Sequence, residues 1–335
     1  FPNVCANCVW KDSGETFLPP FEILEVGGEQ IGFIGVNTTA TLNMVIPDGI
    51  QDITFTDEVD AVNEATQELK EQGIRSMVVL SHMPASQDGD SATGDAANLA
   101  NNVDDEVDVI FAAHNHEIVN AIVDNKLIVQ ALDYGKAFSA VDLEIDPETG
   151  DIVNKEAEIV FVDQSKMDPD PVVSEILANY ENRIAPILNE VIGVAEIAME
   201  GGYGVRGEIG DNALGNLIAD GMKAEMDADF ALMNGGGIRD SLNQGDITWG
   251  ELFNIQPFNN VLMKLEITGA DLYTIMNAQL QAPYGPDYSI SGFHYTWDGS
   301  TYKVVDITFP NGTPIDKEAT YTVVTNNFMA TSTGS

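Results

Sequence analysis

Apolar and polar residues follow two different rhythms along residues 1–165 of the 335-residue chain. Short apolar runs at 77–80 and 107–111 predict buried strands. From Asp57 to Gln72, apolar residues recur at helical spacing, which predicts an amphipathic helix that ends before Gly73. Six further segments have the composition of strands: 22–26, 31–36, 119–123, 127–132, 138–145 and 156–162. Strands mixed with helices in this order predict an α/β fold.

A long helix is predicted over residues 166–193, where it would link two domains. Asp170 can cap its first turn, Pro171 suits the first helical position, and Pro186 predicts a kink that could serve as a hinge. After this helix the pattern again mixes helices with strands, as far as residue 335. We therefore expect domains at 1–165 and 194–335, joined by the helix.

The chain is strongly acidic, with 54 acidic residues against 14 basic ones and a formal net charge of −40. Such a charge repels phosphates, which argues against a nucleic-acid partner. It would also repel a free phosphorylated substrate unless a divalent metal or high salt intervenes. Most of the charge is expected to form the solvated surface of a salt-adapted or secreted protein. No apolar run approaches the ~20 residues that a membrane span requires.

The two cysteines, Cys5 and Cys8, are separated by two residues. A strand over Val4–Val9 would point the two thiols to opposite faces, which argues against a disulfide. Two thiols are also too few for a structural zinc site. No redox role is predicted for them.

Three of the four histidines follow predicted strands: His82 follows 77–80, and His114 and His116 follow 107–111. Ligand sites in α/β sheets lie beyond the carboxyl ends of parallel strands, so the three imidazoles are expected to converge. An extended His114-Asn115-His116 segment would place both of its imidazoles on one side. Because imidazoles are common metal ligands, the pattern predicts a metal site, with polar loop histidines as the alternative.

The other candidate ligands are less favourable. Asp88 and Asp90 lie in a segment that looks solvated, and we do not expect them to bind metal. His294 has no partner nearby in the sequence and is expected to be structural.

The segment Met233–Asp240 contains three consecutive glycines and Arg239, one of only four arginines. Glycines such as Gly236 let a ligand approach the backbone closely, and a guanidinium beside bare N–H groups suits an anionic oxygen. The segment predicts an anion or nucleotide site. A strand-to-turn corner with a solvated arginine is the alternative.

Several segments resemble, in order, the motifs of the 5′-nucleotidase family. Leu80–His82 and Asp108–His116 resemble the second half of its calcineurin-like metallophosphoesterase domain. Four segments resemble its C-terminal substrate domain: Leu214–Asp220, Asn234–Arg239, Gln256–Phe258 and Thr325–Phe328. The resemblance covers nearly the whole chain. It implies an α/β fold in which part of a four-layer metallophosphoesterase sandwich precedes an α/β substrate-binding domain.

The resemblance also implies residue roles. The metal ligands would be His82, His114 and His116, in a site for two divalent ions such as zinc or manganese. The nucleotide-binding residues would be Asn234, Gly236, Arg239, Phe258, Asn260 and Phe328. Of these, the two phenylalanines would sandwich the base, and stacking is worth about 1–3 kcal/mol per ring. Ordinary core packing is the alternative for each phenylalanine.

Some family motifs are not found in the chain. The Asp-x-His, the bridging aspartate and the Asn-His pair are expected upstream of Phe1, so the catalytic residues are unknown. The chain is therefore expected to be an N-terminally truncated fragment that is inactive alone. Arg206 is near the position of a family arginine but out of register, and the closing Gly-Gly-Asp is not seen before Ser335.

The predicted function of the full-length protein is metal-dependent hydrolysis of nucleoside 5′-monophosphates to nucleoside and phosphate. Hydrolysis of UDP-sugars, 2′,3′-cyclic nucleotides or sulfur esters is an alternative within the same superfamily. A non-catalytic nucleotide-binding surface protein is a further alternative. Because such enzymes are usually exported, the resemblance implies an extracellular or cell-surface location.

Overall fold

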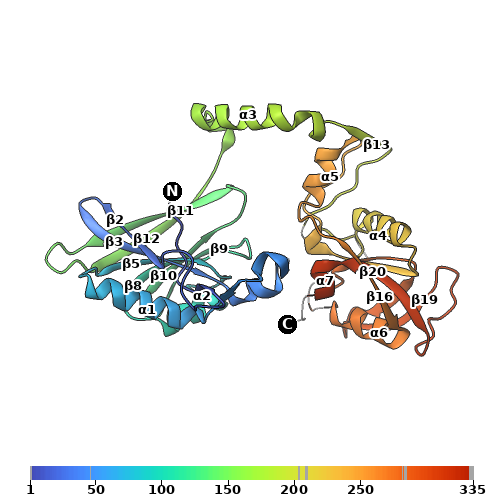
Figure 1. Ribbon diagram of the computed structural model, residues 1–335, viewed down its shortest axis with the longest axis horizontal. Helices are drawn as coiled ribbons and strands as arrows, with labels where there is room; N and C mark the ends of the chain where they lie inside the picture. The colour runs from blue at the N-terminus through green and yellow to red at the C-terminus, as the bar shows by residue number, and fades with distance from the viewer. Residues whose placement is uncertain are drawn as a thin grey trace. The chain divides into compact units, whose positions relative to one another are not determined.

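The computed structural model describes residues 2–45, 47–202, 204–207, 210–280, 282 and 285–331 (Figure 1). The chain divides into two compact units, Phe1–Asp168 and Pro169–Ser335. The last three residues, where the closing family motif was sought, lie outside the described part. Within the described residues, no helix is both long and apolar enough to cross a membrane.

The first unit is built on a six-stranded sheet. Its strands in spatial order are β2 (Phe21–Val26), β3 (Glu29–Asn37), β5 (Ser76–His82), β8 (Val107–Phe111), β10 (Lys126–Ala131) and β9 (Ile118–Val123). The four inner strands are parallel, and the two edge strands β2 and β9 are antiparallel to their neighbours. The parallel pairing of β5 and β8 is the arrangement on which the predicted histidine site depends.

The two faces of this sheet are covered by different elements (Figure 1). Helices α1 (Glu58–Glu71) and α2 (Asp95–Asn102) cover one face over a core that includes Ile34, Met77 and Ile110. The hairpin of β11 (Ala137–Ile145) and β12 (Ile152–Phe161) covers the other face over Val78, Val109 and Val129. The unit is thus a helix, sheet and hairpin sandwich, and the predicted strands and helix are confirmed.

The local signals that bound these elements act as expected. The Asp57 side chain accepts a hydrogen bond from the Asp60 amide at 3.0 Å and begins α1. Gly73, with φ of 84°, follows the end of the helix in the left-handed region. Gly27 and Gly28, with φ of 65° and 97°, form the turn between β2 and β3.

The prediction against a disulfide was wrong, because Cys5 and Cys8 are bonded to each other. The prediction assumed a strand from Val4, but β1 (Cys8–Trp10) begins only at the second cysteine and pairs with β4 (Ile53–Phe55). The residues between the cysteines form a bend that brings their Cα atoms to 5.5 Å.

Asn7 lies inside this bend and is fully buried. Its Nδ2 donates to the carbonyls of Asn37 at 2.7 Å and Thr56 at 3.1 Å, and its Oδ1 accepts from the Asn37 amide at 3.0 Å. One side chain therefore fastens the N-terminal bend to the end of β3.

The second unit begins with α3 (Pro171–Leu188), whose N-terminus is capped by Asp170 as predicted. Pro186 lies in the last turn, and the helix continues through it to Leu188. Strands β13 (Val191–Ala195) and β15 (Gly245–Thr248) pair next to α5 (Trp249–Ile255).

A four-stranded sheet forms the centre of this unit, in the order β16 (Leu262–Thr268), β20 (Thr320–Asn326), β14 (Phe230–Asn234) and β17 (Tyr288–Ser291). Only β14 and β20 are parallel. Helix α4 (Ala213–Met226) packs on one face, around Met233 and Val324. Helix α6 (Gly269–Ala278) and the hairpin of β18 (His294–Asp298) and β19 (Lys303–Thr308) pack on the other, around Phe230. The short helix α7 (Asn327–Thr331) follows β20 directly.

Candidate functional site

The first candidate site lies where β5 and β8 end. His82 is the last residue of β5, and His114 lies in the loop that follows β8. Nδ1 of His114 is 3.2 Å from Nε2 of His82, and the two rings meet edge to face with centroids 5.1 Å apart. Partial loss of water around His82 lowers its pKa, and the charges of His114 and His116 lower the pKa further. The imidazole of His82 is thus favoured in its neutral form, which can bind a metal.

The loop that holds the other two histidines is not extended, so strand alternation does not apply to it. His114 and His116 have φ of 88° and 60°, in the left-handed region that residues with a Cβ rarely adopt. His114 consequently faces His82, whereas Nδ1 of His116 lies 3.3 Å from Oδ2 of Asp133. Asp133, which the sequence did not single out, also pairs with Lys136 at 2.9 Å.

Asn115 holds this loop against the loop after β5. Its Nδ2 donates to the Ala85 carbonyl at 2.8 Å, and its Oδ1 accepts from Nε2 of the buried Gln130 at 2.8 Å. The Ala113 amide adds a bond to the Met83 carbonyl at 3.0 Å. These bonds fix the loop after β8, which bears His114 and His116, against the loop that follows His82.

The distance between the two histidine nitrogens is that of a hydrogen bond, and it also matches a pair of ligands on one metal ion. Two nitrogens that each bind zinc at about 2.0–2.1 Å with tetrahedral geometry lie about 3.3 Å apart, close to the distance between His82 and His114. If Asp133 accepts the Nδ1 proton of His116, Nε2 of that histidine remains available as a ligand. Across the described ranges, however, no three histidine, cysteine, aspartate or glutamate side chains are grouped closely enough to hold a metal. The described residues therefore fit part of a site.

An open groove of about 640 Å³ lies beside His82. Its walls are mainly apolar and include Phe17, Phe111 and the Cys5–Cys8 disulfide. The exposed Leu80 also lines it, at 41% exposure, although it belongs to an inner strand. The imidazole of His82 thus lines a groove whose other walls are mainly apolar.

The second candidate site is an edge of the sheet in the C-terminal unit. Because β14 and β20 are parallel, with Ala231 opposite Val324, their carboxyl ends share one edge. Strand β16 starts at that edge, since Leu262 pairs with Asn326. The segments predicted to bind a nucleotide, 234–239, 256–260 and 325–328, all lie there, where α/β sheets bind ligands.

Arg239 lies against an aromatic ring at this edge. Its guanidinium carbon is 5.0 Å from the ring centre of Phe258, which is 42% exposed. The Arg239 amide donates to the Ile255 carbonyl at 2.8 Å and so joins the glycine turn to the end of α5. Of the ion pairs found among the described residues, none includes Arg239. An arginine stacked on a ring, with no carboxylate partner, can bind an anionic oxygen.

The glycine run forms a 3-10 turn, Gly235–Gly237, directly after β14, with Gly236 half-buried at its centre. A Cβ on Gly237 would collide with the Met233 side chain and lie 3.0 Å from Oδ1 of Asn234. That oxygen accepts a hydrogen bond from Nδ2 of Asn326 at 3.0 Å. A side chain at position 237 would therefore require the end of Met233 to move and Oδ1 of Asn234 to shift slightly.

The loop that bears Phe258 and Asn260 is tied to the start of α7, which bears Phe328. The Asn327 amide donates to the Val261 carbonyl at 2.9 Å, and the Val261 amide donates to Oδ1 of Asn327 at 2.8 Å. Asn260 is exposed, and Phe328 is half-buried. The two phenylalanines thus belong to segments that are bonded together at one edge of the sheet.

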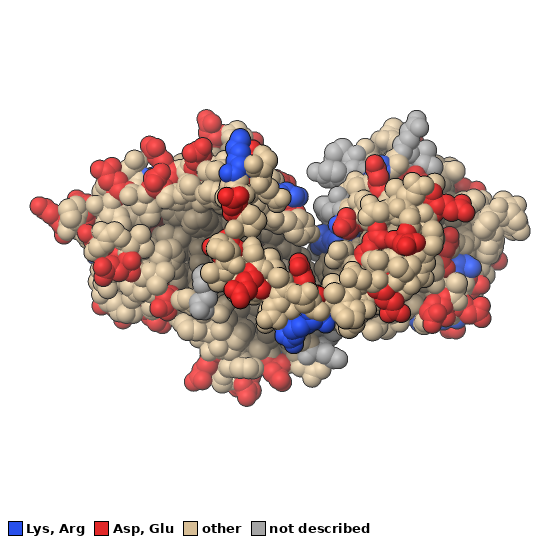
Figure 2. Space-filling view, turned by 90° about the horizontal axis from the view of Figure 1, so that it is seen from above, with Lys and Arg blue, Asp and Glu red and all other residues tan. Residues whose placement is uncertain are grey.

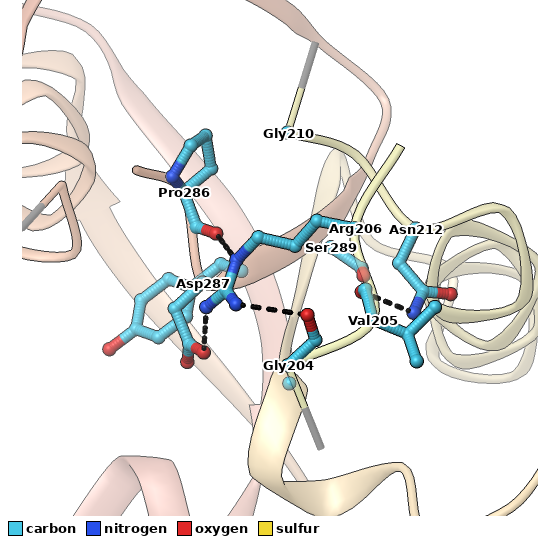
Figure 3. Close-up of a pocket in the computed structure, with 10 residues that line it drawn as sticks. Gly204, Val205, Arg206, Gly210, Asn212, Pro286, Asp287 and Ser289 are labelled. Carbon is cyan, nitrogen blue, oxygen red and sulfur yellow. Dashed lines mark hydrogen bonds and ion pairs between the residues drawn. The ribbon is translucent and has the colours of Figure 1, made fainter. Parts of the chain in front are cut away.

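Arg206 is engaged within its own unit (Figure 3). Its Nη2 lies 3.2 Å from Oδ1 of Asp287, its Nη1 donates to the Gly204 carbonyl at 3.3 Å, and its Nε donates to the Pro286 carbonyl. The cavity beside it measures about 10 Å³, room for roughly one water molecule. Arg206 thus joins two loops in the structure.

Acidic side chains are spread over the visible face of both units, with few basic ones among them (Figure 2). Arg239, which forms no ion pair with another described residue and lies at the edge of β14 and β20, is a cationic side chain that could bind an anion there. The negative electrostatic potential of the acidic surface would slow the approach of a phosphate, so nearby cationic groups must supply the attraction to a bound phosphate.

The fold and these two strand edges define an α/β protein with an imidazole pair in one unit and an arginine–aromatic edge in the other. Residues 191–335 match the family model of the 5′-nucleotidase C-terminal domain. The C-terminal part of the chain is therefore a 5′-nucleotidase C-terminal domain, as the motifs of that segment indicated.

Individual relatives are similar over nearly the whole chain. Endonuclease YhcR of Bacillus subtilis is 58% identical over 100% of this chain and 27% of its own length. Cell wall protein Lmo0130 of Listeria monocytogenes is 36% identical over 97% of this chain and 46% of its own. The crystal structure of a 5′-nucleotidase precursor from Thermus thermophilus superposes with a TM-score of 0.79 and 27% identity, covering 98% of this chain and 69% of that one. The chain thus spans less than half the length of the two curated relatives named here.

Proposed function

We propose that the full-length protein hydrolyses nucleoside 5′-monophosphates to nucleoside and phosphate with the help of divalent metal ions. The observation that carries the proposal is the edge of β14 and β20, where Arg239 lies over Phe258 beside the glycine turn. The similarity to the Thermus thermophilus 5′-nucleotidase precursor supports it.

In this proposal the C-terminal unit binds the nucleotide. The guanidinium of Arg239, which has no ion-pair partner in the described part of the chain, attracts the phosphate, and the exposed Phe258 gives a base a flat apolar surface. Phe328 is the second ring, Asn260 contacts the base, and Asn234 and Gly236 line the approach. A base held between two rings is bound with little dependence on its identity.

The first unit holds part of the metal site. His82 and His114, whose nitrogens face each other, would hold a metal ion, and Asp133 would orient His116 toward it. When bound, the metal ions polarise the phosphate and stabilise its negative charge during hydrolysis. Two or three imidazoles would hold a metal weakly, so we expect the 335-residue chain alone to show no turnover.

The test is phosphate release from AMP by the full-length protein with Mn²⁺ or Zn²⁺. Parallel reactions use UDP-glucose, 2′,3′-cyclic AMP, and single-stranded DNA and RNA, since one relative is named an endonuclease. We expect AMP to be the best substrate. Cleavage of nucleic acid without AMP hydrolysis would contradict the proposal, and so would bound metal with no turnover on AMP.

We also propose an extracellular or cell-surface location. The Cys5–Cys8 disulfide would persist in an oxidising compartment, and one relative is named a cell wall protein. Fractionation of cells that express the full-length protein tests this, with recovery in the cytosol as the contrary result.

A further inference from the structure

A buried side chain connects α7 to the candidate nucleotide site. Asn326 ends β20 and is 3% exposed. Its Oδ1 accepts a hydrogen bond from the Met329 backbone amide at 2.8 Å, and its Nδ2 donates to Oδ1 of Asn234 at 3.0 Å. The three groups form a relay that runs from the helix backbone to the end of β14.

The Met329 backbone amide determines which atom donates and which accepts in both hydrogen bonds of this relay. A backbone N–H can only donate, so the Asn326 atom that faces Met329 must be the amide oxygen. The other Asn326 atom is then the NH₂ group, which donates, and the Asn234 atom facing it must be an oxygen. The NH₂ group of Asn234 is thereby turned away from the relay. Among the described residues, no protein acceptor bonds to it.

We propose that Asn326 is a positioning residue that fixes Asn234 as a hydrogen-bond donor toward the bound nucleotide. The inference rests on the proposed function and adds a specificity to it. The site selects a nucleotide with an acceptor at the point that Asn234 reaches, either an unprotonated ring nitrogen or a ribose oxygen. A nucleotide with a hydrogen-bond donor at that point would face the NH₂ group of Asn234, which is also a donor, and would bind more weakly.

Burial makes this orientation firm. A flipped Asn234 would present an NH₂ group to the NH₂ group of Asn326, and the buried Nδ2 of Asn326 would lose its oxygen acceptor. The relay also starts in α7, the helix that carries Phe328. The position of the proposed stacking ring and the orientation of the Asn234 amide therefore depend on the backbone of the same helix. The missing Cβ of Gly237 leaves room for the Asn234 oxygen.

The first experiment reverses the relay with Asn326→Asp. A carboxylate can still accept from Met329, but its second oxygen needs a donor, so Asn234 should flip and turn its oxygen to the ligand. Dissociation constants are measured for AMP and for its 1-deaza, 3-deaza, 7-deaza, 2′-deoxy and 3′-deoxy analogues. The wild-type protein should bind one analogue about tenfold more weakly than AMP, which identifies the acceptor. In Asn326→Asp this ratio should fall to about one, and AMP itself should bind more weakly.

Two further variants separate orientation from stability and charge. Asn326→Leu removes the relay without reversing it, so the ratio of the dissociation constants for the analogue and for AMP should move toward one. The melting temperature shows whether the variant is folded. Asn311→Asp adds the same charge in an exposed turn of the same unit and should leave every dissociation constant unchanged. An unchanged analogue ratio in folded Asn326→Asp and Asn326→Leu would refute the role of Asn326.

A second measurement needs no ligand. In the ¹⁵N-labelled protein, the side-chain NH₂ of Asn234 should exchange rapidly with water and become protected in Asn326→Asp. Equal exchange in the two proteins would also refute the relay. If the wild-type protein binds no nucleotide while the exchange behaves as expected, the proposed function fails and the relay stands.

Discussion

Nδ1 of His114 lies 3.2 Å from Nε2 of His82, although the two residues are 32 positions apart in the chain. The contact follows from the sheet, because β5 and β8 are parallel neighbours and Leu80 lies opposite Phe111. Each strand delivers its histidine to the same edge. The final distance between the two rings depends on the loops after the strands, which the Asn115 side chain joins by hydrogen bonds.

Replacing Asn115 should therefore weaken metal binding without removing a ligand. In Asn115→Ala the loop after β8 loses its bonds to Ala85 and Gln130, and the orientation of His114 is no longer fixed. We expect the affinity of the full-length protein for Zn²⁺ to fall about 10–100-fold, as for other groups that orient ligands. Isothermal titration calorimetry measures this.

The control is Asn101→Ala on α2. Among the described residues its side chain bonds to the Ala97 carbonyl of its own helix alone, so the same truncation should leave zinc affinity unchanged. Equal zinc affinities for Asn115→Ala and the wild type would show that the Asn115 hydrogen bonds do not position His114.

The placement of these histidines was accessible from the sequence, whereas their contacts were not. Apolar runs and the glycine and aspartate end signals located the strands and α1, because burial and capping depend on neighbours in the chain. The left-handed backbone of His114 and His116 depends on bonds to loops far along the chain, and no local signal encodes it. The same reason explains why Asp133 was missed.

The disulfide was missed for a different reason, which is local to the sequence. A strand assigned a few residues too early placed Cys5 and Cys8 on opposite faces, and a small error in a boundary reversed a chemical conclusion. At the edge formed by β14 and β20, the motif Thr325–Phe328 drew attention to the phenylalanine, while Asn326, two residues before it, is the residue that contacts Asn234. Which member of a motif touches which partner requires the parallel pairing of β14 and β20.

Asn7 should contribute strongly to the stability of the first unit. Asn7→Ala removes three buried hydrogen bonds and leaves the amide of Asn37 without its acceptor. We expect the free energy of unfolding to fall by about 2–4 kcal/mol, since each buried group left unpaired costs about 1–3 kcal/mol. Urea denaturation followed by circular dichroism gives the value. A loss below about 1 kcal/mol would mean that water replaces the amide without penalty.

Arg239 should contribute more to the binding of a nucleotide, through its phosphate, than to the binding of the corresponding nucleoside. Arg239→Ala should raise the dissociation constant for AMP about 10–100-fold, because bonds to charged groups contribute about 1.5–3 kcal/mol. Binding of adenosine, which has no phosphate, should change much less. Arg183→Ala is the matched control, since Arg183 also lies over an aromatic ring, that of Tyr180, at 5.3 Å. A similar loss for AMP and adenosine would assign Arg239 to the ring contact alone.

Asp229 should make the second unit sensitive to acid. Its Oδ2 accepts bonds from the amide and hydroxyl of Thr322, both at 2.8 Å, which joins the start of β14 to β20. The bond from the Thr322 amide lowers the pKa of Asp229, burial opposes this, and the Thr322 hydroxyl, Lys223 and Lys264 lower it further. Because the folded pKa lies below the unfolded one, the carboxylate stabilises the fold above the unfolded value of about 3.9. This contribution is lost as the pH falls through the folded pKa.

Urea denaturation of the wild type and Asp229→Asn between pH 7 and pH 3 measures that contribution. Asparagine keeps an acceptor oxygen but no charge, so the variant should be less stable at pH 7, and the difference should shrink below about pH 4. Other aspartates with lowered pKa values, such as Asp104, titrate in both proteins and cancel in the comparison. A difference in stability that stays constant over this range would mean that the charge of Asp229 contributes nothing and that only the shape of its hydrogen bonds matters.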